Sequence, residues 1–488
     1  VEDKTMFYAA GGCILFGFGA KAGMYPLHIW LPKAHPVAPA PASALLSGIL
    51  TKSGVFGILV ISSEIFLHDE AWGKMILAFG VITMFLGAFL AVFSIDLKRT
   101  LALSSMSQIG FILVGVGMQG ILGYHNSLAV RGTLLHMVNH SLIKLVLFMC
   151  AGAVYMSLHK LDLNSIRGFG RKKPLLKLSF LMGTLGIMGI PLWNGYISKT
   201  LLHESIVEYI EILEEHGSSI ALFKSVEWIF LITGGLTIAY MMKLFIAVFV
   251  EKNVKDQDKF DEKKSYMNYG STFAICGSAI ILPILGFLPT LTMDKIADWG
   301  QDFMYGESPE HAVHYFNFTN LKGAIISIVI GVIVYFVVVR MLLMKKDEQG
   351  NKVYVNAWPQ WLDLENLVYR PIILGLLPFL GALVSRCFEQ LTDGCIRFLR
   401  KTVFKHNKEE SKVVGSRFTF ILGKITEDVV IGYRKLTHKD DANVHFVEKF
   451  AELKNEIDRT GFIIRKSLSF GLLLFCIGLA LTLTYLLM

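Results

Sequence analysis

The chain has 488 residues, of which 53% are hydrophobic and 18% are charged, and its mean hydropathy is +0.53. These proportions exclude an ordinary soluble domain, in which apolar faces alternate with charged ones. The formal net charge of +8 is expected for a membrane protein with basic cytoplasmic loops, so no nucleic-acid partner is needed to explain it.

Apolar runs recur along the chain, each of roughly 20 residues, the length needed to cross a ~30 Å hydrocarbon core. Helices satisfy their own backbone polar groups in lipid, and these continuous runs lack the alternation of barrel strands. The sequence therefore predicts an all-α fold, a polytopic transmembrane helical bundle. Its spans are expected at residues 7–31, 42–62, 75–95, 101–119, 128–157, 175–209, 225–250, 269–291, 321–344, 371–391 and 468–488.

The beginning of the chain predicts a fragment. Val1 stands where a complete protein would have Met, and the first apolar run follows almost at once. No basic region and small-residue cleavage site of a signal peptide precede it. We expect the natural N-terminus to lie upstream.

The loops between residues 62 and 346 alternate in charge. Basic loops hold Lys98 and Arg99, Arg167 to Lys173, Lys252 to Lys264, and Lys345 with Lys346. Acidic loops hold Glu64, Asp69 and Glu70, Glu208 to Glu215, and Asp294 to Glu310. Because basic loops stay in the cytoplasm, we expect a multi-pass protein of the cell (cytoplasmic) membrane, with the 32–41 loop on the cytoplasmic side.

The charge pattern fails near the C-terminus. If 371–391 spans the membrane, the basic stretch from Arg397 to Lys412 falls outside, so that segment is either buried or re-entrant, or the orientation rule is overridden. Residues 392–466 are polar, with one amphipathic stretch that predicts a surface helix or a soluble helical extension. Its apolar residues at helical spacing are Phe418, Ile421, Leu422, Ile425 and Val429.

The sequence predicts no catalytic residue, no cofactor and no metal site. The cysteines show neither metal-ligand spacing nor a disulfide framework, which favours a packing role. They are Cys13, Cys150, Cys276, Cys387, Cys395 and Cys476. No CxxC, haem-attachment, nucleotide-binding or nucleophile motif occurs, so any oxidoreductase activity would belong to a complex.

Four lysines lie inside apolar runs: Lys21, Lys52, Lys144 and Lys199. A lysine at the centre of the bilayer costs about 3 kcal/mol on insertion scales, so such residues usually have a function or a partner. Lysines near the end of a span can extend to the headgroups instead. Lys52 and Lys144 lie too deep in their runs for that, and we expect both to be functional.

The spacing of His136, His140 and Lys144 places all three on one face of a helix. Imidazoles and a shielded ammonium group can take up and release protons near neutral pH, so we interpret these residues as a proton relay. Two histidines one turn apart also suit zinc, but no carboxylate or thiol falls at a suitable spacing. A hydrogen-bonded histidine pair of the core is the other alternative.

Helix-breaking residues lie next to two of the lysines. Pro26 follows Lys21, while Pro191 and Gly195 precede Lys199. Proline removes a backbone hydrogen bond and glycine relaxes the helix. We therefore expect two discontinuous helices, which at membrane depth need protein or water to cover them and which transporters use to build ion sites.

Four segments carry a family resemblance: KAGMYPLHIWLPKAHPVAPAPASALLSGILTKSG, DLKRTLALSSMSQIGFILVGVG, HMVNHSLIKLVLFMCAGAV and GIPLWNGYISKTLLHE. In this order they resemble the antiporter-like subunits of respiratory complex I, a family that includes Mrp-type cation/proton antiporters and membrane subunits of group 4 hydrogenases. The resemblance covers about residues 7–250. It implies an inverted-repeat, antiporter-like architecture.

The resemblance also implies roles for individual residues. Lys21 would be the lysine of the first broken helix, and Lys52 the bridging lysine. His136, His140 and Lys144 would form the central relay, and Lys199 would be the terminal lysine of the second broken helix. The helix whose glutamate pairs with the first lysine in the family is missing ahead of Lys21.

Two segments, GIPLWNGYISKTLLHE and WLDLENLVYRP (residues 361–371), most resemble the large antiporter-like subunit of formate hydrogenlyase and of hydrogenase 4 (component B). We expect the end of the first half with its broken helix, the second repeat, additional membrane helices, a polar amphipathic segment and a final transmembrane helix. These parts cover residues 1–31, 32–291, 292–391, 392–466 and 467–488.

The resemblance implies a proton- or sodium-translocating subunit of a redox-driven complex, such as a group 4 hydrogenase, a formate hydrogenlyase or a complex I-like NADH dehydrogenase. The implied partners are the lipid bilayer, other membrane subunits and, through them, a hydrogenase or dehydrogenase arm. One alternative is a free-standing Mrp-type Na⁺/H⁺ antiporter subunit. A second alternative is a structural membrane anchor of a hydrogenase.

Overall fold

The structure is a computed structural model that describes residues 4–309, 313–359, 365–402, 416–436 and 445–487. It contains two compact units, residues 1–370 and 371–488. The five-part division expected from the sequence is finer than this and stays a prediction. Each unit is described by itself.

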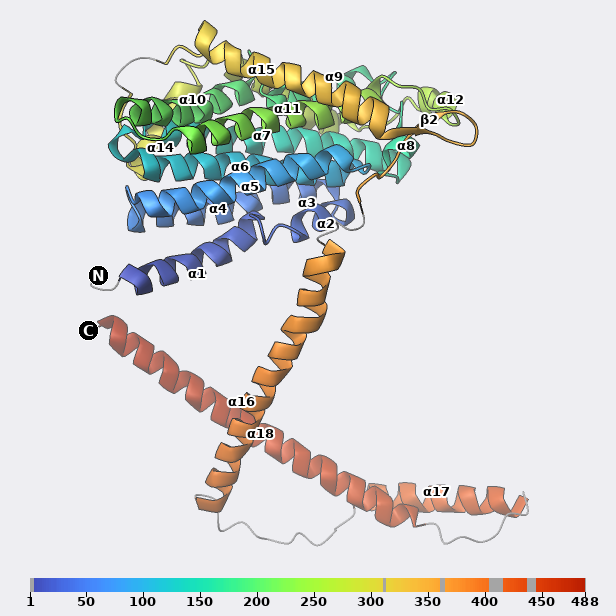
Figure 1. Ribbon diagram of the computed structural model, residues 1–488. Helices are drawn as coiled ribbons and strands as arrows, with labels where there is room; N and C mark the ends of the chain where they lie inside the picture. The colour runs from blue at the N-terminus through green and yellow to red at the C-terminus, as the bar shows by residue number, and fades with distance from the viewer. Residues whose placement is uncertain (1–3, 310–312, 360–364, 403–415, 437–444, 488) are drawn as a thin grey trace. The chain divides into compact units, whose positions relative to one another are not determined.

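Unit 1 consists of helices and one short hairpin, with η marking 3₁₀ or π turns (Figure 1). Its elements are α1 (Lys4–Ala22), α2 (Trp30–Val37), α3 (Ala40–Leu45), η1 (Leu46–Leu50), α4 (Thr51–Val60), η2 (Ile61–Ile65), α5 (Glu70–Phe93), α6 (Leu97–Leu122), η3 (Gly123–His125), α7 (Ser127–Leu158), α8 (Leu163–Ile166), α9 (Pro174–Met188), α10 (Asn194–Glu215), α11 (Ala221–Phe249), α12 (Gln257–Glu262), α13 (Tyr269–Phe287), α14 (Met293–Gln301), η4 (Asp302–Met304), α15 (Phe318–Val334), η5 (Tyr335–Leu342), β1 (Met344–Lys346), β2 (Lys352–Tyr354) and η7 (Glu365–Tyr369).

Among the described residues, eight helices are long and apolar enough to cross a membrane, which confirms the predicted multi-pass helical bundle. They are Ala40–Ile65, Glu70–Phe93, Leu97–His125, Ser127–Leu158, Ala221–Phe249, Tyr269–Phe287, Asn320–Leu342 and Glu365–Phe398. The apolar window of α6 is wholly buried, whereas those of α13 and α15 are mostly exposed. Helices α5, α6, α7 and α11 run side by side, so α6 lies at the centre of unit 1 (Figure 1).

Helices α5 and α6 pack through glycines spaced seven residues apart. A Cβ atom added at Gly73, Gly80 or Gly87 would lie between 2.6 and 2.8 Å from the backbone of α6. On α6, Gly110 and Gly117 face the backbone of α5 in the same way. Small residues let transmembrane helices approach closely and so gain dispersion energy. The polar groups of α6 are thereby held at fixed positions in the centre of the bundle.

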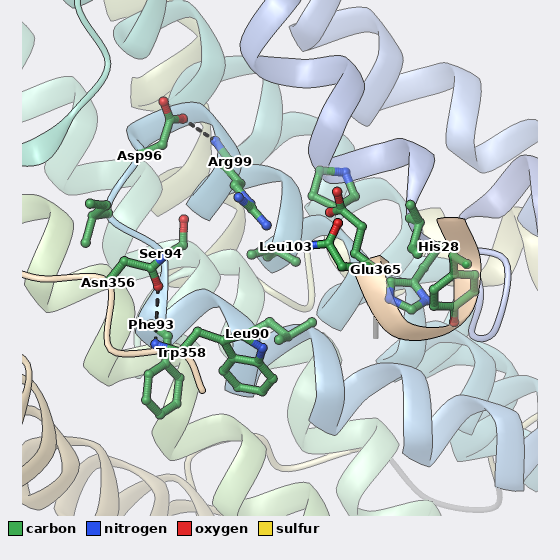
Figure 2. Close-up of a pocket in the computed structure, with 15 residues that line it drawn as sticks. His28, Leu90, Phe93, Ser94, Asp96, Arg99, Leu103, Asn356, Trp358 and Glu365 are labelled. Carbon is green, nitrogen blue, oxygen red and sulfur yellow. Dashed lines mark hydrogen bonds between the residues drawn. The ribbon is translucent and has the colours of Figure 1, made fainter. Parts of the chain in front are cut away.

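The chain after the hairpin encloses a cavity of about 330 Å³ next to the first interrupted helix. Figure 2 shows Trp358 beside Phe93 and Glu365 near His28, with Arg99 next to Asp96. Glu365 forms an ion pair of 2.6 Å with Lys33. This segment holds part of the WLDLENLVYRP motif, of which residues 361–364 lie outside the described residues.

The β1–β2 hairpin is fixed to the rest of unit 1 by hydrogen bonds. Asn164 donates from its side chain to the carbonyl of Tyr354 and accepts from its backbone N–H, both at 2.8 Å. The Arg167 guanidinium donates to the carbonyl of Lys352 at 2.7 Å. The Asn164 amide and the Arg167 guanidinium therefore bind three backbone groups of β2 and hold this strand against α8.

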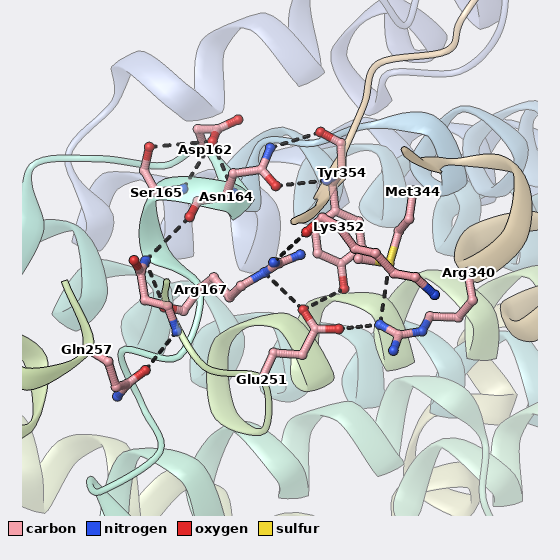
Figure 3. A network of polar contacts seen from close by, with 11 residues as sticks. Asp162, Asn164, Ser165, Arg167, Glu251, Gln257, Arg340, Met344, Lys352 and Tyr354 are labelled. Carbon is pink, nitrogen blue, oxygen red and sulfur yellow. Dashed lines mark hydrogen bonds and ion pairs between the residues drawn. The ribbon is translucent and has the colours of Figure 1, made fainter. Parts of the chain in front are cut away.

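Glu251 lies at the centre of the polar network that joins α11 to this hairpin (Figure 3). Its carboxylate pairs with Arg167 at 3.0 Å and also accepts a hydrogen bond from Arg340. The Tyr354 hydroxyl donates to the same carboxylate at 3.2 Å. Burial raises the pKa of Tyr354, so the phenol stays neutral and remains a donor.

Unit 2 contains η8 (Ile372–Leu376), α16 (Leu377–Thr402), α17 (Arg417–Leu436) and α18 (Phe446–Leu487). Helix α17 covers the amphipathic segment predicted to be helical. It packs on α18 where Gly423 meets Val447, and the Val447 N–H donates to Glu427 at 3.1 Å. Most of the basic stretch from Arg397 to Lys412 lies outside the described residues.

Replacing Glu251 by Ala should lower the free energy of unfolding by about 3 kcal/mol, because it leaves the buried Arg167 guanidinium without its counter-charge. The measurement is thermal unfolding of the detergent-solubilised protein. The control is Lys259→Ala, which removes an exposed ion pair with Asp256 and should cost less than about 1 kcal/mol. Equal losses in the two variants would contradict a central role for Glu251.

Candidate functional site

Helix α7 carries the predicted row of titratable side chains. His136, His140 and Lys144 follow one another at intervals of four residues along its middle, and all three side chains are buried. In α7 the row therefore lies on one face, as the spacing requires. The two ends of the row contact different helices, so α7 connects the second interrupted helix to α6.

Lys144 is held by oxygen atoms of α6. Its ammonium group donates to the carbonyl of Leu101 at 2.8 Å and makes a short contact with the Ser104 hydroxyl. The ring of Phe148 lies one turn further along α7, with its centroid 5.9 Å from the ammonium nitrogen. No carboxylate among the described residues pairs with Lys144, so oxygen dipoles alone stabilise its charged form.

Lys52 lies in the first turn of α4, directly after the π turn η1. Its ammonium donates to the carbonyl of Ser47 at 2.5 Å. The hydroxyl of Ser47 lies 2.5 Å from that of Ser105 on α6. Since Ser104 contacts Lys144, adjacent serines of α6 link Lys52 with Lys144.

The other end of the row reaches α10 through His136. Nδ1 of His136 lies 2.9 Å from the hydroxyl of Ser198 in a hydrogen bond. The next residue is Lys199, a buried lysine whose ammonium donates to the carbonyl of Ile187 at 2.8 Å. Ile187 belongs to the last turn of α9, where helix carbonyls lack partners and attract cations.

The second interruption separates α9 from α10. It comprises residues 189–193, in which Gly189 and Leu192 adopt positive φ angles, and it contains Pro191. Gly195 lies in the first turn of α10, where a Cβ atom would stand 1.9 Å from the carbonyl oxygen of Gly186. The glycine at position 195 is therefore required by the close approach of the two half-helices.

Asn139 on α7 fixes this interruption. Its amide nitrogen donates to the carbonyl of Asn194 at 2.8 Å and to Ser198 at 3.1 Å. The side chain of Asn194 donates back to Asn139 at 3.0 Å. Both asparagines are fully buried, so each hydrogen bond lost here would leave an unsatisfied polar group. The start of α10 is thus held against the middle of α7.

The first interruption separates α1 from α2 and contains Pro26. Trp30 closes it by donating from its indole to the carbonyl of Ala20 at 2.8 Å. Lys21 lies in the last turn of α1, and its side chain is exposed in this chain. The structure therefore does not join Lys21 to the buried row, although its backbone packs against Gly54 of α4.

Several polar atoms along the row have no hydrogen-bond partner among the described residues. They are both ring nitrogens of His140, Nε2 of His136 and the amide nitrogen of Gln108. Buried polar atoms are normally satisfied by protein or by ordered water. Bound water would satisfy these atoms, and such water carries protons between side chains.

The spacing of the lysines and histidines did not predict further polar residues that lie near the row or elsewhere in the bundle. Asn139 sits inside HMVNHSLIK, and Ser198 directly precedes Lys199, so both could have been found from the motifs. His203 lies four residues after Lys199 and shares its face. Lys243 had a signal too, as a lysine deep in the apolar run of α11.

Lys243 makes a different kind of contact from the lysines of the row. Its ammonium donates to the carbonyls of Ala91, Val92 and Ser94, at distances between 2.6 and 3.0 Å. These carbonyls lie at the C-terminal end of α5, which attracts a positive charge. Lys243 therefore caps the C-terminal end of α5 and fixes α11 to this helix.

Gly189→Ala should destabilise the protein more than Gly217→Ala. Both glycines have positive φ, where a side chain costs about 1–2 kcal/mol. Only at Gly189 would the new Cβ also meet Lys199, at 2.9 Å from Cδ, whereas nothing lies within 4 Å at Gly217. The measurement is thermal unfolding of both variants.

In the double variant Gly189→Ala/Lys199→Ala, the additional loss of stability caused by the clash should disappear, which a double-mutant cycle measures. If the extra loss persists without the lysine side chain, Gly189 does not fix the position of Lys199.

Comparison with known proteins shows similarity to membrane subunits of several complexes. Residues 1–213 match the family described as NADH:quinone oxidoreductase/Mrp antiporter, TM. Hydrogenase-4 component B of Escherichia coli is 37% identical over 239 residues, which cover 47% of this chain and 35% of that protein. Formate hydrogenlyase subunit 3 of Escherichia coli is 34% identical over 247 residues, which cover 48% of this chain and 39% of that protein.

The chain thus spans little more than a third of the length of these two relatives. A chain in the structure of the Mrp complex from Dietzia sp. DQ12-45-1b has a TM-score of 0.54 and 19% identity, over 62% of this chain and 60% of that chain. This likeness shows a shared fold. Residues 1–213 are therefore similar to the NADH:quinone oxidoreductase/Mrp antiporter family, and the chain is a multi-pass helical membrane protein.

Proposed function

We propose that this chain is a proton-translocating membrane subunit of a redox-driven complex in the cytoplasmic membrane. The observation that carries the proposal is the buried row from Lys52 to Lys199, in which α7 links α6 to the second interrupted helix. The names of the relatives, a hydrogenase component and a formate hydrogenlyase subunit, support a redox partner. The other membrane subunits would provide the connection to it.

The chemistry of the row favours protons over sodium ions. Its titratable groups are amines and imidazoles, which bind protons at nitrogen. A hard cation such as sodium is instead bound by several oxygen ligands. Lys52, Lys144 and Lys199 pair with carbonyl and hydroxyl oxygens and with no carboxylate among the described residues.

The proposed mechanism is electrostatic. A charge or conformational change from the redox partner alters the surroundings of Lys21, and a proton then moves by way of Lys52 and Lys144 to the histidines. Lys199 exchanges it at the far end. A unit charge pair at about 4 Å and an effective dielectric of about 20 is worth about 4 kcal/mol. That energy changes a protonation constant by a factor of about 1000, which is enough to release a proton from a lysine.

Lys144→Gln should abolish most proton transport, because glutamine keeps hydrogen-bonding capacity and cannot carry a proton. We expect a decrease of about 100-fold, the usual effect of losing one proton-transfer group. The measurement uses inverted membrane vesicles containing the assembled complex and a pH-sensitive dye, with formate, hydrogen and NADH tried in turn as electron donors.

The control for this experiment is Lys173→Gln. Lys173 is also buried and donates to a carbonyl, that of Phe260, but it lies away from the row. Its replacement should leave transport intact. Unchanged transport in Lys144→Gln would exclude the proposed relay and favour a structural anchor. Transport driven by a sodium gradient with no electron donor would favour the free-standing antiporter.

A further inference from the structure

A small cavity lies beside Lys199, on the side away from the row of α7. Its volume is about 40 Å³, and its polar lining includes Lys199, His203, Asn320 and Ser327. A water molecule needs about 10–15 Å³ of such volume and at least two polar partners. The cavity therefore has space for about three or four waters between Lys199 and His203.

His203 joins two carboxylates of different helices. Its Nδ1 lies 3.3 Å from Glu204 on the same helix, and its Nε2 lies 3.5 Å from Glu227 on α11. The imidazole itself is largely buried and packs against the ring of Phe230, with centroids 5.8 Å apart. A histidine between two carboxylates can accept a proton on one nitrogen and release one from the other.

The carboxylates lead to the surface of the chain. Glu227 forms an ion pair of 3.1 Å with Lys224, whose side chain is 45% exposed. Helix α10 continues from His203 to the acidic segment Glu208 to Glu215, which marks the acidic end of the bundle. The cluster therefore faces this end. Lys199, the cavity, His203 and the carboxylates thus follow one another from the membrane interior toward that end.

We propose that His203, with Glu204 and Glu227, is the port through which Lys199 exchanges protons with the aqueous phase at the acidic end. The port rests on the proposed function, because it serves the terminal lysine of the relay. A proton leaves the Lys199 ammonium, crosses the cavity water and binds one imidazole nitrogen, while the other nitrogen gives its proton to a carboxylate. One proton moves outward, and no bond between heavy atoms changes.

The test uses His203→Gln in vesicles that contain the assembled complex, with the dye assay described for Lys144→Gln. Glutamine keeps the hydrogen-bonding capacity and approximate size of histidine but cannot take up a proton. Proton transport should fall about 100-fold while the amount of assembled complex and its melting temperature stay unchanged. Transport at the normal rate in this variant would overturn the port.

The matched control is His216→Gln. His216 lies at the same end of the bundle, is exposed and forms a hydrogen bond with the carbonyl of Ile212 at 2.7 Å. Its replacement should not alter transport. If His203→Gln instead reduces the amount of complex and its melting temperature in proportion to transport, Glu204→Gln decides between the port and a structural role of His203.

A second variant keeps the test decisive where His203→Gln fails to assemble. Glu204→Gln leaves the ion pair with Glu227 in place, so a merely structural role for His203 predicts unchanged transport. The port predicts slower transport at an unchanged amount of complex. If Lys144→Gln stops transport and both port variants do not, only the port fails. If Lys144→Gln leaves transport intact, the proposed function itself fails.

Discussion

An ammonium group inside a membrane needs oxygen atoms around it, and the central structure of this protein depends on supplying them. Removing a lysine from water costs several kcal/mol unless its donors are satisfied. Helix interiors offer few free oxygens, because each carbonyl already accepts a backbone bond. Interrupted helices, helix ends and serine side chains provide the exceptions. Lys199 donates to a carbonyl at the end of α9, and Lys144 donates to a serine and a carbonyl of α6. Lys52 donates to the carbonyl of Ser47 in the π turn η1.

The same interaction serves two purposes in this bundle. Lys243 binds three carbonyls at the end of α5, a set of contacts that satisfies all of its donors and fixes two helices together. Lys144 and Lys199 have fewer protein acceptors and lie beside polar atoms or space that water can occupy. A satisfied lysine stabilises the fold, while a lysine with donors left for water can pass a proton on. Lys243 therefore has more protein acceptors than Lys144 or Lys199 of the proposed relay.

Close packing of the helices fixes the distances between the donors and acceptors of these contacts. The glycines of α5 and α6 bring the two backbones together, which fixes the serines of α6 against Lys144 and Ser47. Asn139 and Asn194 hold the start of α10 against α7 in the same way. Glu251, just after α11, joins the β1–β2 hairpin to this helix through its polar contacts. Each of these contacts lies where two helices meet, and displacement by a fraction of an ångström there would separate donor from acceptor.

The sequence by itself determined the multi-pass helical fold, the two interrupted helices and the shared face of His136, His140 and Lys144. Apolar length, helix-breaking residues and the helical period are local properties, and α7 accordingly differs from the expected 128–157 span by one residue at each end. Only the tertiary structure decided which oxygens hold each lysine, that Lys21 stays apart from the buried row, and that His203 meets Glu227 from another helix. Those contacts join segments distant in the chain, so their geometry depends on how the helices pack against one another and not on spacing along any one of them.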